Sequence, residues 1–223
     1  MGNNILLIFD LDGLLVDSEK LFYKAFKEIS KKFPGAEISF EKYTQEIVSL
    51  GLEFDDVLKL EKHELDEFKS LLYERYAKLI DSELEVRKGA TKCLKRFKEY
   101  DKVLVTSSKQ DICDLILNKF HLNSYFKEKI KRDNGFKLKP STETFEYLLE
   151  KYKKKNWQAC VIEDSKRGII PAQKLNIPCI FIPNSFTKKE IFGPSVRQLE
   201  DLDALNNDII NEICKEKTSP SRY

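Results

Sequence analysis

Histidine is scarce in this sequence, and the cysteines follow no metal-binding or disulfide pattern. The 223 residues include only two histidines, His63 in the charged run KLEKHELDEF and His121 after a helical stretch. Neither position favours a catalytic triad or another histidine-based mechanism. The five cysteines are scattered and form no Cys-x-x-Cys, which argues against a disulfide framework or a zinc site. We expect Cys160 and Cys179, in strand-like runs, to be small buried hydrophobic residues.

Long apolar segments and an excess of one charge are also missing. No apolar run approaches about 18 residues, so a transmembrane helix is not expected. The N-terminus lacks the apolar stretch of a signal peptide, because Asp10 interrupts its hydrophobic segment. The 39 basic and 37 acidic residues nearly cancel, so charge gives no reason to expect nucleic acid or acidic lipid as a partner. We therefore expect a cytoplasmic protein with no nucleic-acid or membrane partner, and a monomer by default.

The sequence does contain a long helical stretch, followed by strands that alternate with helices. Apolar residues at helical spacing predict helices in the first part of the chain, the second of them with Ser39 as its N-cap. Strand-like runs and helices alternate afterwards, which predicts an α/β fold, a parallel sheet with helices on both faces. The helical insert after the first strand covers residues 20 to about 86. The expected helices are 21–33, 39–51, 53–62, 64–80, 109–120, 141–154 and 166–175, and the expected strands are 5–9, 102–107, 128–133, 159–164 and 177–183.

Polar residues collect where the predicted strands end. Ligands of open parallel sheets bind at the carboxyl ends of the strands, and residues two apart in an extended chain point the same way. Close carboxylates suit a hard cation such as Mg²⁺, whereas hydroxyls, an ammonium and backbone N–H groups suit phosphate oxygens. Phosphoryl transfer to an aspartate fits both requirements. The residues at this edge are Asp10, Asp12, Thr106, Ser107, Glu163 and Asp164, with Lys139 at the start of the helix that lies in the chain between the ends marked by Ser107 and by Glu163.

Each of these features has an ordinary structural explanation when taken alone. Asp-x-Asp-Gly is common in turns, Thr-Ser-Ser is a usual loop entry, and Glu-Asp-Ser often caps a helix. A lysine before proline is mostly exposed to solvent. The four motifs occur together, in this order, and each lies at the expected end of its strand or helix. Their combination indicates a phosphoryl-transfer site much more strongly than any one motif does.

Four segments, FDLDGLLVDSE, VLVTSSK, KPSTETF and VIEDSKRGI, resemble the four motifs of the haloacid dehalogenase (HAD) superfamily. The specific likeness is to its phosphatases with a helical cap inserted after the first strand, of the beta-phosphoglucomutase and pseudouridine-5′-phosphatase type. This resemblance implies a Rossmann-like parallel sheet core, a helical cap domain and a requirement for Mg²⁺. The corresponding division is a core of residues 1–17 and 87–215, a cap of 18–86 and a disordered tail of 216–223.

The resemblance also implies a role for each matching residue in catalysis. Asp10 would be the nucleophile that forms an aspartyl-phosphate, and Asp12 the general acid and base. Lys139 would neutralise the nucleophile and the transferring group. Phosphate oxygens would be bound by Thr106, by Lys139 and by the backbone at Leu11 and Ser107.

The metal site implied by the resemblance uses the same edge of the sheet. Mg²⁺ would be held by Asp10, by the backbone carbonyl of Asp12 and by Asp164. Glu163 would lie among these ligands or directly behind them. The expected substrate is a small phosphate monoester, either a sugar phosphate or a nucleotide-like monophosphate.

Three other functions remain open at this point. A dehalogenase would need neither Asp12 nor Asp164, because halide leaves without a proton and the reaction uses no Mg²⁺. A non-catalytic binding protein would be expected to have lost the catalytic residues. A phosphosugar mutase needs bases on the cap, but none lies between Lys42 and Lys59, where Gly51 is followed by acidic residues. Phe22 and Tyr23 stand where such mutases have a histidine, and we expect them to shape an apolar wall.

Overall fold

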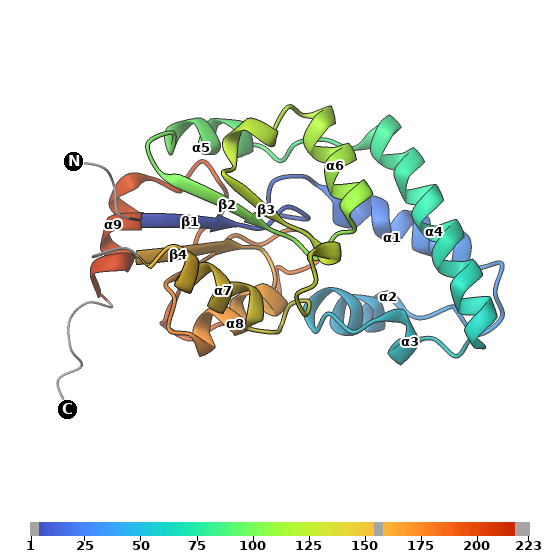
Figure 1. Ribbon diagram of the computed structural model, residues 1–223. Helices are drawn as coiled ribbons and strands as arrows, with labels where there is room; N and C mark the ends of the chain where they lie inside the picture. Colours follow the sequence, from blue (N-terminus) through green and yellow to red (C-terminus); the bar gives the residue numbers. More distant parts are fainter. Residues whose placement is uncertain (1–4, 154–157, 217–223) are drawn as a thin grey trace.

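The computed structural model describes residues 5–153 and 158–216, in which the central feature is a parallel sheet (Figure 1). Its six strands follow the order β3-β2-β1-β4-β5-β6, and every neighbouring pair is parallel. This arrangement confirms the predicted α/β fold with a Rossmann-like sheet. The strands are β1 Ile5–Phe9, β2 Asp101–Val105, β3 Glu128–Ile130, β4 Gln158–Glu163, β5 Cys179–Phe181 and β6 Val196–Gln198.

Strand β1 lies in the middle of the sheet because all five of its side chains are apolar and both faces of the sheet are covered. Leu7 and Phe9 pack in the hydrophobic cluster that contains α5, α6 and α9. Leu6 and Ile8 point to the opposite face and pack under α7 and α8. The covering helices are α5 Ala90–Arg96, α6 Gln110–Lys119, α7 Glu143–Lys151, α8 Lys166–Lys174 and α9 Asn207–Glu216.

Several elements differ from those expected from the sequence. The strand expected over 102–107 ends at Val105, and the one expected over 159–164 ends at Glu163. The polar residues at these ends therefore follow the strands. Strand β6 was not predicted, because two of its three residues are polar and it contains no apolar run. Helix α9 reaches Glu216, and the rest of the tail expected to be disordered lies outside the described residues.

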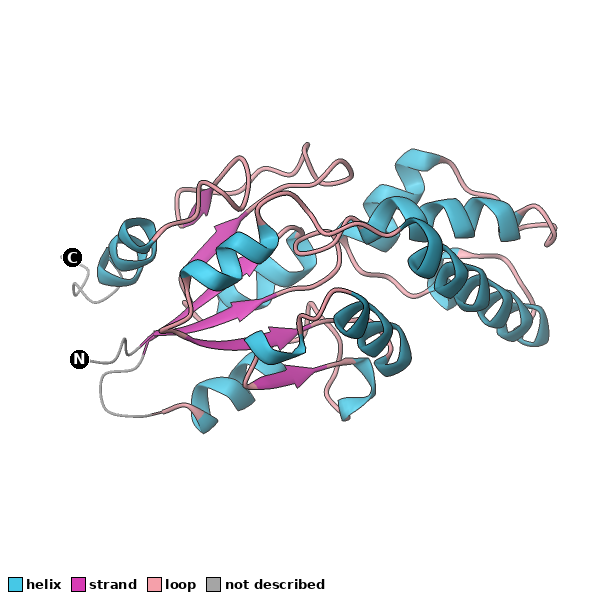
Figure 2. Ribbon diagram, turned by 90° about the horizontal axis from the view of Figure 1, so that it is seen from above, coloured by secondary structure: helices cyan, strands magenta, loops and turns pink. Residues whose placement is uncertain are grey.

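The insert between β1 and β2 is helical, as expected, and lies beyond the carboxyl ends of the strands (Figure 2). Ser39 caps its second helix, since its Oγ accepts a hydrogen bond from the Lys42 N–H. The helix predicted over 53–62 was too long. The observed helix ends at Val57, because the backbone of Leu58 is extended. None of the helices in the described ranges has the length and apolar character needed to cross a membrane. The elements of the insert are α1 Ser18–Ser30, α2 Phe40–Lys42, the π-helical η1 Tyr43–Ser49, α3 Phe54–Val57 and α4 Lys62–Glu83.

Aromatic rings form the core of this insert. Phe26 stacks on Phe54 with 5.7 Å between ring centroids, and the edge of Phe68 meets Phe54 at 5.5 Å. All three side chains are buried. Their packing holds α1, α3 and α4 together, and it fixes the residues of these helices that face the sheet.

Candidate active site

The chain turns sharply after β1, and the turn brings two parts of the predicted site together. Gly13 has a φ of +75°, in the left-handed region that favours glycine. A Cβ at this position would lie 2.2 Å from Oδ2 of Asp164, so the close approach also requires glycine. The Arg87 guanidinium fixes the turn by donating to the carbonyl of Gly13 and, at 2.9 Å, to that of Pro183.

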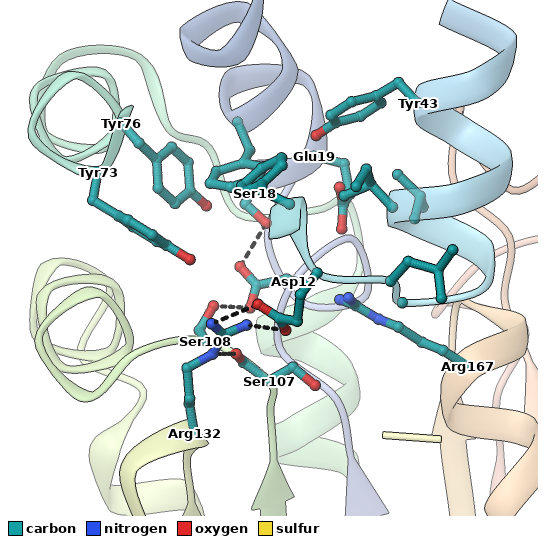
Figure 3. Close-up of a pocket in the computed structure, with 17 residues that line it drawn as sticks. Asp12, Ser18, Glu19, Tyr43, Tyr73, Tyr76, Ser107, Ser108, Arg132 and Arg167 are labelled. Carbon is teal, nitrogen blue, oxygen red and sulfur yellow. Dashed lines mark hydrogen bonds and ion pairs between the residues drawn. The ribbon is translucent and has the colours of Figure 1, made fainter. Parts of the chain in front are cut away.

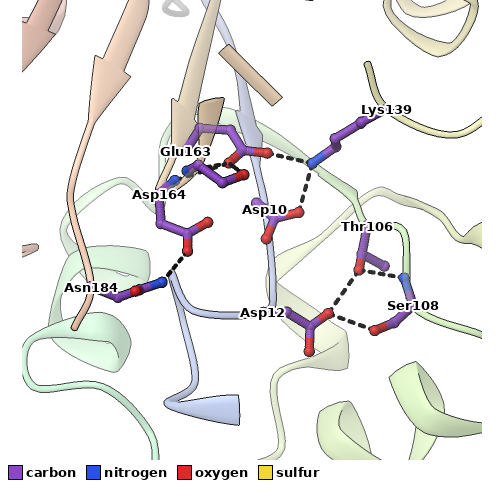
Figure 4. A network of polar contacts seen from close by, with 9 residues as sticks. Asp10, Asp12, Thr106, Ser108, Lys139, Glu163, Asp164 and Asn184 are labelled. Atoms are coloured by element: carbon purple, nitrogen blue, oxygen red, sulfur yellow. Dashed lines mark hydrogen bonds and ion pairs between the residues drawn. The ribbon is translucent and has the colours of Figure 1, made fainter. Parts of the chain in front are cut away.

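Lys139 lies at the centre of a buried ion-pair network (Figure 4). Its Nζ is 2.6 Å from Oδ1 of Asp10 and 2.6 Å from Oε1 of Glu163. The three side chains are 5%, 7% and 1% exposed, so removing the Lys139 ammonium would leave two carboxylates without compensation in a dry environment. Burial lowers the pKa of Lys139, but the charges of Asp10 and Glu163 outweigh this effect and raise it.

Glu163 is held in one orientation by donors from its own loop. Its Oε2 accepts hydrogen bonds from the Asp164 N–H at 2.9 Å and from the N–H and hydroxyl of Ser165, both at 3.1 Å. A Cβ at Gly168 would lie 1.7 Å from Glu163 Oε1, so this glycine makes room for the carboxylate. Burial raises the pKa of Glu163, but the charge and hydrogen bond of Lys139 bring it below its usual value.

Three carboxylates form a group that suits a divalent cation. Asp10, Glu163 and Asp164 each offer an oxygen, and these oxygens lie within 4.8 Å of one another. Asn184 donates from Nδ2 to Oδ2 of Asp164 and orients it. Burial raises the pKa of Asp10 to about 7, against the opposing charge of Lys139, and burial with the charges of Glu163 and Asp10 raises that of Asp164. Such a dense set of buried oxygen donors fits a hard cation, which would relieve this repulsion.

The side chain of Asp12 lies apart from this group and is held by three hydroxyls. Ser18 Oγ donates to its Oδ1 at 2.9 Å (Figure 3). Thr106 Oγ1 and Ser108 Oγ donate to its Oδ2 at 3.0 and 2.6 Å (Figure 4). The Ser108 N–H in turn donates to Thr106 Oγ1 at 3.0 Å. The carboxylate of Asp12 is therefore fixed in direction, two residues after Asp10.

A cavity of about 90 Å³ opens above Asp12, between the sheet and the helical insert (Figure 3). Two of its lining residues, Arg132 and Glu53, form an ion pair at 3.2 Å. Burial raises the pKa of Glu19 to about 7, although the charge of Arg167 opposes this rise. The cavity is lined by Asp12, Ser18, Glu19, Phe22, Tyr43, Ile47, Val48, Gly51, Leu52, Glu53, Phe54, Tyr73, Tyr76, Ser107, Ser108, Arg132 and Arg167.

The structure brings most of the predicted site residues to one edge of the sheet. Asp10, Lys139, Glu163 and Asp164 are in mutual contact or close by, and Thr106 contacts Asp12. The Leu11 side chain is fully buried, which leaves only its backbone to face the site. The Ser107 hydroxyl is buried and has no partner within residues 5–153 and 158–216.

The two aromatic residues expected to form the wall behave differently. Phe22 lines the cavity, as does Gly51. Tyr23 does not line it and packs against Tyr43 and Phe40, with ring centroids at 4.8 and 5.1 Å. The expectation is therefore wrong for Tyr23, because the turn of α1 points this ring away from the cavity.

Sequence reasoning missed several residues around the site. Ser108 directly follows the predicted pair of hydroxyl residues, and Asn184 directly follows the predicted strand 177–183, so position at a strand end was an available signal for both. Ser18 is the first residue of the expected cap, and its hydroxyl donates to Asp12. No feature of the sequence marked Glu19 and Arg167 as site residues. Both lie on helices, α1 and α8, and the sequence does not show how these helices pack against each other.

Comparisons with known proteins agree with this geometry. The family model described as "Haloacid dehalogenase-like hydrolase" matches residues 7–182. A curated relative, "Phosphorylated carbohydrates phosphatase" of Thermotoga maritima, is 25% identical over 185 residues, which cover 78% of this chain and 83% of the relative.

Two solved structures show the same fold at lower identity. CbbY from Rhodobacter sphaeroides has a TM-score of 0.77 at 20% identity, over 92% of this chain and 96% of that one. A HAD hydrolase of family IA from Entamoeba histolytica has a TM-score of 0.78 at 19% identity, over 96% and 100%. Because the family model matches most of the chain, this chain belongs to the haloacid dehalogenase-like hydrolase family.

Proposed function

We propose that this enzyme hydrolyses a small phosphate monoester in a Mg²⁺-dependent reaction, through an aspartyl-phosphate on Asp10. The observation that carries the proposal is the separation of two carboxylates with different surroundings. Asp10 is paired with Lys139 beside Asp164, whereas Asp12 is held by hydroxyls at the floor of the cavity. One carboxylate is thus suited to nucleophilic attack and the other to proton transfer.

In the first half-reaction, an oxygen of Asp10 attacks phosphorus and the bond to the leaving oxygen breaks. Asp12 gives its proton to that oxygen, so that the alcohol leaves neutral. In the second half-reaction, Asp12 takes a proton from water, whose oxygen attacks the phosphorus and releases inorganic phosphate from Asp10. Lys139 balances charge on the nucleophile throughout, and Thr106 with the Ser107 N–H would bind the phosphoryl oxygens.

The metal part of the proposal rests on the same carboxylates. Asp10, Asp164 and the backbone carbonyl of Asp12 would hold Mg²⁺, with Glu163 kept by Lys139 directly behind them. When bound, Mg²⁺ supplies positive charge to the phosphoryl oxygens. The division into a core of 1–17 and 87–215 and a cap of 18–86, the monomeric state and the cytoplasmic location belong to the same proposal.

A mutase or a bisphosphate-specific enzyme is the main competitor, since CbbY has been solved with xylulose-1,5-bisphosphate. The charges around this cavity argue against a second phosphate. Asp12, Glu19 and Glu53 face it, and Glu53 already pairs with Arg132. A further anion would be repelled, and more strongly where water is excluded.

The test is turnover of p-nitrophenyl phosphate by the purified chain, with Mg²⁺ and after EDTA. We expect metal-dependent hydrolysis, and a loss of several orders of magnitude in kcat for Asp10→Asn. Acid-quenched enzyme should carry phosphate on Asp10 when examined by peptide mass spectrometry. Asp208→Asn, an exposed change on α9, is the matched control and should retain full activity. Substantial turnover by Asp10→Asn would contradict the covalent mechanism.

A further inference from the structure

Arg167 enters the cavity from α8 and its guanidinium has no partner. Among the residues that the structure describes, no hydrogen bond or ion pair involves this side chain, whereas Arg132 pairs with Glu53 and Arg87 binds backbone carbonyls. The helical insert covers the aliphatic part of the Arg167 side chain, since a Cβ on Gly51 would lie 3.1 Å from Cδ of Arg167. A guanidinium has five N–H donors in a fixed fork, and those of Arg167 are available to a ligand.

Glu19 and Tyr43 line the same wall of the cavity (Figure 3). Glu19 is the strongest charged neighbour of Arg167, but the two make no direct ion pair. Tyr43 is fully buried, and its hydroxyl has no hydrogen-bond partner in the described part of the chain. A buried hydroxyl without a partner is destabilising, so its presence on this wall points to a ligand that completes it.

These three groups offer donors and acceptors in a mixture that suits hydroxyl groups. A hydroxyl can accept from the Arg167 fork and donate to the Glu19 carboxylate at the same time. A second anion fits less well, because the lining contains three carboxylates and two guanidiniums. The rings of Phe22 and Tyr76, which contact each other edge to face, offer apolar surface to a carbon skeleton.

We propose that Arg167, Glu19 and Tyr43 form a hydroxyl-binding subsite, which selects phosphate monoesters of small, uncharged polyols or sugars. This inference rests on the proposed function, because the subsite binds the leaving group of that reaction. Arg167 and Glu19 bind one hydroxyl between them, and Tyr43 binds a neighbouring hydroxyl. The residues act on specificity and leave the chemistry at Asp10 unchanged.

The test compares substrates that share a carbon skeleton and differ in hydroxyls. Glycerol 3-phosphate is paired with propyl phosphate, and ribose 5-phosphate with 2-deoxyribose 5-phosphate. For the wild type we expect kcat/KM to favour the hydroxylated member of at least one pair by about tenfold to a hundredfold, the effect of one charge-assisted hydrogen bond. In Arg167→Gln the preference should fall to within about threefold. Lys166→Gln, an exposed neighbour on α8, is the matched control and should keep it.

Two further variants separate binding from folding. Arg167→Lys keeps the charge and most of the stem beneath Gly51 but loses the fork, so we expect it to fold and to lose most of the preference. Tyr43→Phe removes an unpartnered buried hydroxyl, so it should melt no lower than the wild type and still reduce the preference severalfold. A merely structural tyrosine would give the opposite result, a lower melting temperature with the preference unchanged.

The outcomes distinguish this inference from the function on which it rests. If the wild type does not hydrolyse p-nitrophenyl phosphate with Mg²⁺, both are overturned. If it does, but does not discriminate within either pair, only the hydroxyl-binding subsite is overturned. Equal losses of kcat/KM on both members of a pair in Arg167→Gln would also overturn it, because they would assign Arg167 to the transferring phosphoryl group.

Discussion

Replacing Asp10 by asparagine should abolish turnover and, in metal-free protein, make the fold more stable. Burial raises the pKa of Asp10 from 3.8 to about 7, with Lys139 opposing and Glu163 adding to the rise. The folded protein therefore holds a proton that the unfolded chain releases between about pH 4 and pH 7. For a carboxyl group with a raised pKa, stability is lost as the pH rises through this window. The advantage of the variant should thus be absent near pH 4 and complete above pH 7.

The size of the effect follows from the same shift. A rise from 3.8 to about 7 corresponds to a cost on the order of 4 kcal/mol above pH 7. Part of this cost is offset, because the Asp10 carboxylate also stabilises the Lys139 ammonium, and asparagine keeps only a neutral acceptor at 2.6 Å. We expect a net gain of about 2 kcal/mol, or about 4 to 8 °C in melting temperature for a chain of this size.

Glu163→Gln is the matched control, because this substitution is expected to destabilise the fold, whereas Asp10→Asn is expected to stabilise it. Folding lowers the pKa of Glu163, so its ionised form contributes stability. Its Oε1 accepts from Lys139, and its Oε2 accepts from donors of Asp164 and Ser165. An amide in its place gives up the ion pair with Lys139 and sets an N–H donor against the donors of Asp164 and Ser165, which costs about 3 kcal/mol.

The assay is thermal and denaturant unfolding of the three proteins in EDTA, at pH 5 and pH 8. Adding saturating Mg²⁺ should stabilise the wild type by mass action, and Asp10→Asn much less. The reasoning is refuted if Asp10→Asn is less stable than the wild type at pH 8 in EDTA, or if Glu163→Gln is stabilised to the same extent.

Three further predictions concern the site and the core. Beryllium fluoride with Mg²⁺ should inhibit the wild type and raise its melting temperature, because it mimics a phosphoryl group on Asp10, and it should leave the melting temperature of Asp10→Asn unchanged. Fructose 6-phosphate should be preferred to fructose 1,6-bisphosphate by about tenfold or more in kcat/KM, because the second phosphate meets the carboxylates of the cavity; a preference for the bisphosphate would contradict this. Burial raises the pKa of the Cys93 and Cys113 thiols to about 12. At pH 8 both should therefore react with a thiol reagent only as fast as the chain unfolds. Rapid labelling of the native protein would contradict the burial of these thiols.

Much of the site could be anticipated because polar residues that follow neighbouring strands of a parallel sheet gather at the same edge of that sheet. Asp10 follows the most apolar run of the chain, and Asp164 follows another such run. The apolar runs predicted the strands. Because ligands of a parallel sheet bind at the carboxyl ends of its strands, the residues after these strands were predicted to form one site. The same reasoning was wrong for Tyr23, because the direction of a ring on α1 depends on how that helix is rotated against the rest of the insert.

Local patterns were sufficient to predict the α/β fold and the carboxylates at the ends of β1 and β4, because buried strands are visible as apolar runs and ligand-binding residues follow their carboxyl ends. Which charges are partnered depends on the tertiary structure. Lys139 lies between Asp10 and Glu163, whereas Arg167 and Glu19 line the same cavity and form no ion pair with each other. Such partners come from segments far apart in the chain, and their distances depend on the packing of the helical insert over the sheet. A local pattern therefore contains no information about them.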